Sequence, residues 1–187
     1  MQADSAEPQA AHPDDDGGPP RSLIIAALVL TVAAIAAVLA FAGSRRTPPT
    51  PVAIAAVPAE QAGSPECQAL LATLPDRLGD YSRADTVQPT PAGTAAWRAD
   101  GEPVILRCGL GRPAEFVVGS PIQMVNDVQW FRLEDPQSPL ATWLCVDRPV
   151  YVALTLPTGS GPTPIQVLSD VIDRSMPAIP IRPAPAR

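Results

Sequence analysis

The sequence contains no lysine, and its single histidine, His12, lies close to the N-terminus. Without these side chains, the chain beyond its first 20 residues cannot form a Ser-His-Asp or Cys-His catalytic arrangement, a Schiff-base lysine or a histidine metal site. Carboxylate chemistry is the enzymatic route that this composition leaves open. We therefore predict no catalytic residues, no metal ligands and no cofactor, and we expect that the protein is not an enzyme.

Aromatic residues are also scarce, at 4% of the chain, yet Trp97, Trp130 and Trp143 all fall in one central region. Because each indole buries a large apolar area, we expect these rings to form the core. The alternative is that they line a pocket for a small ligand. All basic side chains are arginines and the formal net charge is −6, so the chain lacks the positive surface of a nucleic-acid-binding protein. We expect no nucleic-acid partner.

One long run lacks charge altogether: Leu23 to Ala42 contains a single polar side chain, Thr31. A helix of this length spans roughly 30 Å, the thickness of one hydrocarbon core. We predict a transmembrane helix over 22–43 that anchors the chain in the plasma membrane. The small-x-small pattern ending at Ala42 leaves the alternative of secretion after cleavage near that residue. The run is longer than the roughly 7–15 apolar residues of a signal peptide, which favours an uncleaved anchor.

Proline is abundant, with 25 residues, and it marks the segments that lack a folding pattern. Residues 1–21 are acidic and proline-rich, which is typical of a disordered tail. Residues 44–63 are rich in proline and alanine and are predicted to form a stalk. Residues 177–187 are predicted to be an extended proline-rich tail. This division leaves residues 64–176 for one extracytoplasmic domain.

Residues 64–176 show a helix pattern at each end and strand patterns between them. Ser64 is a suitable N-cap for the first helix, and Thr163 with Pro164 is suitable for the start of the second. Asn126–Asp127 and residues 134–139 have the composition of turns. We predict an α+β fold, in which a small, mainly antiparallel sheet of about five strands is flanked by an N-terminal and a C-terminal helix. The strand patterns are AAWRA, PVILRC, EFVVG running to IQMV, VQWFRL, TWLCV and VYVALTL.

The segment Gly109–Ala114 matches the Gly-x-Gly-x-x-Ala pattern of dinucleotide-binding loops. That loop binds pyrophosphate because a helix begins at its second glycine and points backbone N–H groups at the ligand. Here Pro113 removes one such donor, and the sequence that follows is strand-like. The motif is therefore interpreted as a structural corner at the end of a strand.

Three cysteines, at 67, 108 and 145, allow three single-bridge pairings. Cys67 shares the apolar face of the first helix, and Cys108 alternates with Val104 and Leu106 in a strand, so both thiols should point into one interface. In TWLCV the inward residues are expected to be Leu144 and Val146, which places Cys145 on the opposite face. We predict a Cys67–Cys108 disulfide; the alternative is three ordinary buried thiols.

A disulfide requires an oxidising compartment, so the predicted bridge places the domain outside the cytoplasm. The positive-inside rule opposes this orientation, since Arg45 and Arg46 follow the apolar run and Arg21 alone directly precedes it. The difference is one arginine, and we follow the cysteines.

Taken in order, CQALLATLP, AAWRADGEPVILRCG, VNDVQWF and DRPVYVALTLP resemble the actinobacterial membrane-associated family catalogued as domain of unknown function 3515. The resemblance covers roughly Cys67 to Met176. This chain departs from the family pattern at Asp127, where a small residue is usual, and at Cys145, which supports leaving Cys145 out of the bridge. The resemblance implies an envelope protein of high-GC actinobacteria and implies no activity. The matching positions are Cys67, Trp97, Pro103, Arg107, Cys108, Gly109, Val125, Asn126, Val128, Trp130 and Arg148.

Together these patterns predict a single-pass, membrane-anchored envelope protein. Its extracytoplasmic domain is expected to bind envelope proteins or cell-wall material, or to be structural, without catalysing a reaction. One alternative is a carboxylate-dependent envelope hydrolase or transferase. The other is a small-ligand or lipid-binding domain.

Overall fold

The computed structural model describes residues 20–44, 50–133 and 138–186, and the chain divides into two compact units, Met1–Pro48 and Pro49–Arg187. The acidic N-terminal tail, Arg45 and Arg46, and most of the turn predicted at 134–139 lie outside the described residues. Each unit is considered by itself below.

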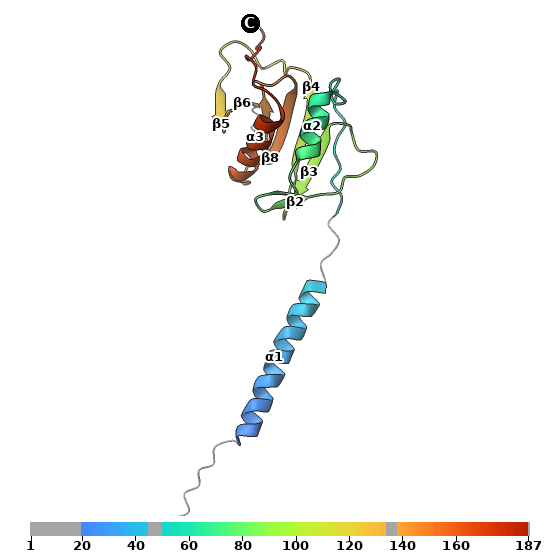
Figure 1. Ribbon diagram of the computed structural model, residues 1–187, viewed down its shortest axis with the longest axis vertical. Helices are drawn as coiled ribbons and strands as arrows, with labels where there is room; N and C mark the ends of the chain where they lie inside the picture. Colours follow the sequence, from blue (N-terminus) through green and yellow to red (C-terminus); the bar gives the residue numbers. More distant parts are fainter. Residues whose placement is uncertain (1–19, 45–49, 134–137, 187) are drawn as a thin grey trace, which may run out of the picture. The chain divides into compact units, whose positions relative to one another are not determined.

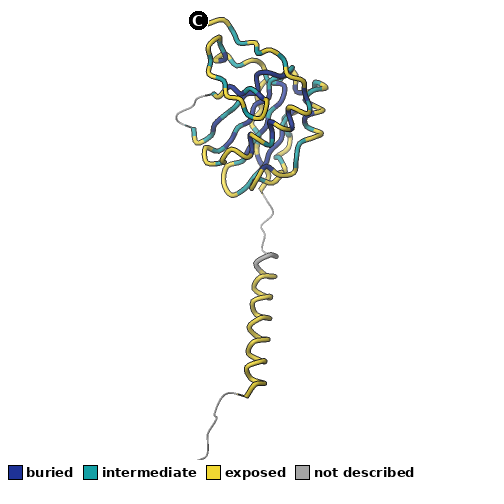
Figure 2. The backbone as a smooth tube through the Cα atoms, turned by 60° about the vertical axis from the view of Figure 1, so that its left-hand side comes forward, coloured by how far each residue is buried: buried dark blue, intermediate teal, exposed yellow. Residues whose placement is uncertain are grey.

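The described part of the first unit is a single helix, α1 (Arg21–Ser44). Its large apolar side chains, Leu39 among them, are exposed to the surroundings along the helix (Figure 2). The hydroxyl of Thr31 donates a hydrogen bond to the carbonyl oxygen of Ala27 at 2.8 Å, so this polar group is satisfied within the helix. By length and composition, α1 can cross a membrane.

The second unit is an eight-stranded antiparallel sheet with two helices, α2 (Pro65–Thr73) and α3 (Thr163–Ser175). The α+β class and the two flanking helices are as predicted, but the expectation of about five strands is wrong. The strand order is β1-β2-β3-β4-β8-β7-β6-β5. The strands are β1 (Arg77–Leu78), β2 (Tyr81–Arg83), β3 (Thr94–Arg98), β4 (Val104–Leu110), β5 (Ile122–Val125), β6 (Val128–Leu133), β7 (Leu140–Cys145) and β8 (Tyr151–Pro157).

Strands β1 and β2 escape prediction because they are only two and three residues long, too short for an alternating pattern. The segment EFVVG is not a strand; it is a loop that makes one parallel bridge, from Val117 to Ala184. The turn predicted at Asn126–Asp127 is confirmed. Both residues have positive φ, 45° and 63°, as a two-residue hairpin between β5 and β6 requires.

Both faces of the sheet are apolar. Helices α2 and α3 lie side by side on one face (Figure 1), over the main core that contains Leu106, Leu154 and Ile172. A smaller cluster on the opposite face centres on Phe116 and Phe131, whose ring centroids lie 5.3 Å apart. Successive side chains in a strand point to opposite faces of the sheet. Because an apolar cluster covers part of each face, the central strands bury side chains on both faces.

Residues 50–63 of the predicted stalk and residues 177–186 of the predicted tail pack against the domain. Val52 is buried, and its strand-like segment bridges Thr86 in parallel. At the other end of the chain, Ala184 donates its N–H to the carbonyl oxygen of Phe116 at 2.9 Å, and Ile181 packs on the smaller cluster. Residues from both sides of the predicted 64–176 domain therefore complete its core.

Candidate functional site

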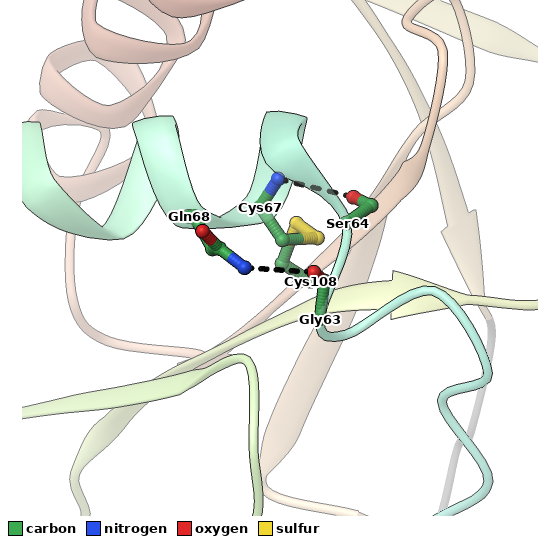
Figure 3. Close-up of a disulfide and its surroundings, with 5 residues drawn as sticks. All are labelled: Gly63, Ser64, Cys67, Gln68 and Cys108. Atoms are coloured by element: carbon green, nitrogen blue, oxygen red, sulfur yellow. Dashed lines mark hydrogen bonds between the residues drawn. A yellow bond between two sulfur atoms is a disulfide. The ribbon is translucent and has the colours of Figure 1, made fainter.

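The disulfide joins the first turn of α2 to β4, and it pairs Cys67 with Cys108 as the sequence predicts (Figure 3). Their Cα atoms lie 5.7 Å apart, and both residues are fully buried. The hydroxyl of Ser64 accepts the N–H of Cys67 at 3.2 Å, so the predicted N-cap starts α2 at the bridge. The bridge therefore fixes the start of α2 onto the central part of the sheet.

Gly109 follows the bridge in a position that no other residue can fill without rearrangement. Its φ is +87°, β4 shifts register between Cys108 and Leu110, and a Cβ atom at Gly109 would lie 2.2 Å from the backbone nitrogen of Ala62. The carbonyl oxygen of Gly109 accepts the N–H of Gln61 at 3.1 Å. Gly111 has open space around it. The glycine motif is thus a structural corner, and of its two glycines only Gly109 is required by the backbone conformation and the close approach of residue 62.

A buried ionic network fastens the β5–β6 hairpin and α3 to the start of β8. The guanidinium of Arg148 is buried and contacts the Asp147 carboxylate at 2.9 Å and the Asp173 carboxylate at 2.8 Å. It also donates to the carbonyl oxygen of Asp127 at 3.0 Å. The amide of Asn126 donates to Asp170 of α3 at 2.9 Å. Both carboxylates at Arg148 are engaged by its two terminal nitrogens, while its buried Nε has no hydrogen-bond partner.

Cys145 lies in the main core with the disulfide, and the expectation that it points to the opposite face is wrong. The alternation in TWLCV is as predicted, but Leu144 and Val146 belong to the smaller cluster on the face away from the helices. Cys145 is a free thiol, 3.6 Å from the Asp147 carboxylate. Burial raises the pKa of this thiol, and the charge of Asp147 raises it further. These surroundings make Cys145 an inert core residue.

Trp97 and Trp130 are fully buried, and each indole N–H has a partner. Trp97 donates to the carbonyl oxygen of Pro75 at 2.9 Å, and Trp130 donates to the hydroxyl of Ser169 in α3 at 2.9 Å. Buried indoles with satisfied N–H groups are typical of core residues. Two of the three tryptophans therefore have the structural role that the sequence favours.

Trp143 is half-buried and lies at a hollow of about 510 Å³. Arg132 is its direct neighbour across β6 and β7, and the guanidinium carbon lies 5.6 Å from the indole centroid. Two adjoining hollows of about 510 and 400 Å³ share Gln123, Arg132 and Trp143 in their walls; we call them together the Trp143 trough. The further lining residues of the first are Glu115, Ser120, Pro121, Trp130, Phe131 and Leu133.

The trough combines an apolar floor with a few polar groups, which is the usual composition of a ligand-binding hollow. Its second half is bounded by Leu156 of β8, Ile165 of α3 and the loop that carries Ser160 and Gly161. Glu115 is the one carboxylate among the described residues that line either half. Within the described residues, no group of three or more His, Cys, Asp or Glu side chains is placed to hold a metal ion. The trough can bind through apolar contact and hydrogen bonds.

A sequence model of the family described as protein of unknown function (DUF3515) matches residues 28–181. The chain belongs to this family. No curated protein and no solved structure is significantly similar to the chain.

The residues that carry the resemblance to DUF3515 have structural roles here. Cys67, Cys108 and Gly109 form the corner at the end of β4, while Asn126 and Arg148 dock the β5–β6 hairpin on α3. The DUF3515 match also extends beyond the predicted domain at both ends, in agreement with the packing of the segments that flank it.

Sequence reasoning missed the Arg148 network and the position of the trough, which it offered only as the alternative of a small-ligand pocket around Trp97, Trp130 and Trp143. A signal for the first was present, because Asp147 and Arg148 are adjacent charges between the apolar residues Val146 and Val150. Charges in such a run are buried when they can pair with each other and with a third group. The trough had no local signal, since Arg132 and Trp143 meet through the register of β6 and β7.

Proposed function

We propose that this DUF3515 protein is a single-pass plasma-membrane protein, anchored by α1, whose domain lies on the extracytoplasmic side and binds a component of the cell envelope without catalysis. The resemblance described above adds that the envelope is that of a high-GC actinobacterium. The binding surface in this proposal is the Trp143 trough, whose two halves have volumes of about 510 and 400 Å³.

One observation carries the location: a fully buried disulfide in the domain that follows a helix of membrane-spanning length. Disulfides persist in oxidising compartments and are rare where thiols are kept reduced. Burial on the main core indicates that the bridge is part of the folded structure. The one-arginine difference across the apolar run opposes this orientation by a smaller margin.

Reporter fusions test the orientation. A reporter active only after export, fused after Arg46 or at the C-terminus, should be active in the natural host or a related one. A reporter active only in the cytoplasm, fused at the same positions, should be silent. The reverse pattern would contradict the proposed location and remove the reason for the disulfide.

Binding is favoured over catalysis by the state of the charged groups. Asp147 and Asp173 are in ion pairs with Arg148, and Cys145 is a buried thiol with a raised pKa. A carboxylate-dependent hydrolase needs two carboxylates facing a common substrate position. The trough offers Glu115 by itself.

Photo-crosslinking from the trough tests the binding surface. A photoreactive residue at Thr158, which is exposed and lines the trough, should capture an envelope component in intact cells. The matched control is the same residue at Val87, which is also exposed and lies outside the trough. Equal labelling patterns from the two positions would contradict a role for the trough.

A second candidate, a small apolar ligand or lipid as the bound component, is favoured by the half-buried Trp143 among the residues that line the trough. Binding there would change tryptophan fluorescence, and Trp143→Phe would remove most of that change. Extraction of a lipid with the purified full chain, lost in Trp143→Ala, would support this candidate. Absence of lipid from the wild-type chain would leave the macromolecular partner.

A further inference from the structure

Strand β5 forms one edge of the eight-stranded sheet. Its hairpin closes on the pair Val125 and Val128. Hydrogen-bonded and non-hydrogen-bonded pairs alternate from that point, so Gln123 bonds to β6, while the backbone N–H and C=O groups of Ile122 and Met124 point outward. The N–H of Val146 donates to the carbonyl oxygen of Gln129, which shows independently that Gln129, the partner of Met124, bonds toward β7.

This edge is short and begins directly after Pro121, but it lacks the charges that usually keep strand edges apart. The stretch Val117 to Val125 contains no charged residue, and the side chain of Met124 is 66% exposed. The opposite edge, β1, is two residues long, carries Arg77, and is flanked by Asp76 and Asp80. Natural proteins protect exposed edges by short strands, charges and coverage. Edge β1 has this protection, and β5 is uncharged.

We propose that β5 pairs with β5 of a second copy of the chain, in antiparallel orientation, to form one continuous sheet. A two-fold axis through Gln123 sets Ile122 opposite Met124 of the other copy. In this register the outward N–H and C=O groups of both residues are satisfied, and the two Gln123 residues form the central non-hydrogen-bonded pair.

The strand is self-complementary in this register. Ile122 and Met124 share one face, so apolar side chains meet apolar side chains across the interface. The Gln123 side chains meet on the other face, where their amides can donate to and accept from each other. No charge on either strand opposes its own copy.

A strand of this length is a small contact, and anchoring in one membrane raises the effective concentration of the second copy. The anchoring of both copies in one membrane rests on the proposed function. The test therefore reports topology and pairing separately, from two cysteine variants of the full-length chain.

The test is Gln123→Cys. Paired residues at a non-hydrogen-bonded position have Cα atoms about 4.5 Å apart, within the disulfide range of about 4.4–6.8 Å. Under mild oxidation in membranes, the variant should become mainly a disulfide-linked dimer. Val87→Cys, exposed and distant in the sheet order from β5, should remain monomeric. A membrane-impermeant thiol reagent applied to intact cells should label Val87→Cys, whose thiol takes no part in the pairing.

Four results are possible. Labelling with crosslinking supports pairing and location; labelling without crosslinking overturns pairing and leaves the location standing. Crosslinking in isolated membranes without labelling in cells supports pairing and overturns the location. Absence of both labelling and crosslinking overturns both the pairing and the location.

A second variant checks that crosslinking depends on the edge hydrogen bonds. Met124→Pro removes an outward N–H that the fold does not use, whereas Met124→Thr keeps it. Added to Gln123→Cys, the proline should lower the crosslinked fraction several-fold and the threonine should not. The Cys67–Cys108 bridge, checked by peptide mapping, reports that each variant is folded. Equal crosslinking by the folded proline and threonine variants would overturn the proposed register.

Discussion

The two helices on the sheet are fastened in different ways. Helix α2 is fixed covalently, by the Cys67–Cys108 bridge. Helix α3 is fixed by polar contacts, from Arg148 to Asp173 and from Trp130 to Ser169. The first fastening depends on the redox state of the compartment, whereas the second depends on ion pairing and hydrogen bonding at Arg148 and Trp130. The domain can therefore be weakened at one helix by reduction and at the other by a single unpaired charge.

Removal of Arg148 should have the largest effect, and it acts on the α3 side. Arg148→Ala leaves the buried Asp147 carboxylate without its partner, so the free energy of unfolding should fall by about 3–5 kcal/mol. Denaturant unfolding of the oxidised protein measures this. Arg174→Ala, an exposed residue of the same helix, should change it by less than about 0.5 kcal/mol. Equal effects of the two variants would show that the network does not hold α3.

Loss of the bridge should have a similar or slightly smaller effect on the α2 side. The bridge spans a sequence separation of 41 residues, which corresponds to about 4 kcal/mol in the chain-entropy model. A Cys67→Ala/Cys108→Ala variant should unfold at lower denaturant concentration than the wild type. Reductant should destabilise the wild type and leave the double variant unchanged. Insensitivity of the wild type to reductant would contradict a stabilising bridge.

A smaller loss is expected at the corner after the bridge. Gly109→Ala places a Cβ atom against the backbone of Ala62 at a φ of +87°, and we expect a loss of about 1–3 kcal/mol or more from strain. Gly111→Ala, two residues away in open space, is the matched control and should stay within about 0.5 kcal/mol of the wild type. Similar losses at both glycines would mean that the close approach of residue 62 is not needed.

The smallest effect is the pH response of Cys145, which lies between the two fastenings. Its thiol has a raised pKa in the folded state, while an unfolded thiol ionises near pH 8.5. Above that pH the unfolded state binds fewer protons, so the free energy of unfolding should fall as pH rises, by up to about 1.4 kcal/mol per pH unit. Cys145→Ala should lack this contribution between about pH 8.5 and 10. If the free energy of unfolding falls equally with pH in the wild type and in Cys145→Ala, Cys145 does not make this contribution.

Much of this domain is predictable from local pattern. The Ser64 cap and the apolar spacing predict the helices, and alternation in PVILRC directs Cys108 toward the face that receives Cys67. The prediction of Thr163 as the cap of α3 is wrong, because Pro162 holds that position and no side chain caps the helix. The Asn126–Asp127 turn is predictable because few residue pairs accept two positive φ values. These features depend on neighbours within a few residues of each other.

What could not be predicted depends on the covering of both sheet faces and on strand register. Since Leu144 and Cys145 are both buried, on opposite faces, alternation could not say which of them faces the helices. Neither the pairing of Arg132 with Trp143 nor the meeting of Arg148 with Asp173 follows from local sequence. The Trp143 trough and the α3 fastening are both products of such distant pairings.

The redox state of the three cysteines in the native membrane tests the account most directly. Free thiols are trapped by alkylation in intact cells, and the protein is then mapped by mass spectrometry with and without prior denaturation. We predict a Cys67–Cys108 peptide pair in nearly all molecules and a Cys145 thiol that reacts only after denaturation. Three free cysteines in the native protein would contradict both the covalent fastening of α2 and the extracytoplasmic location.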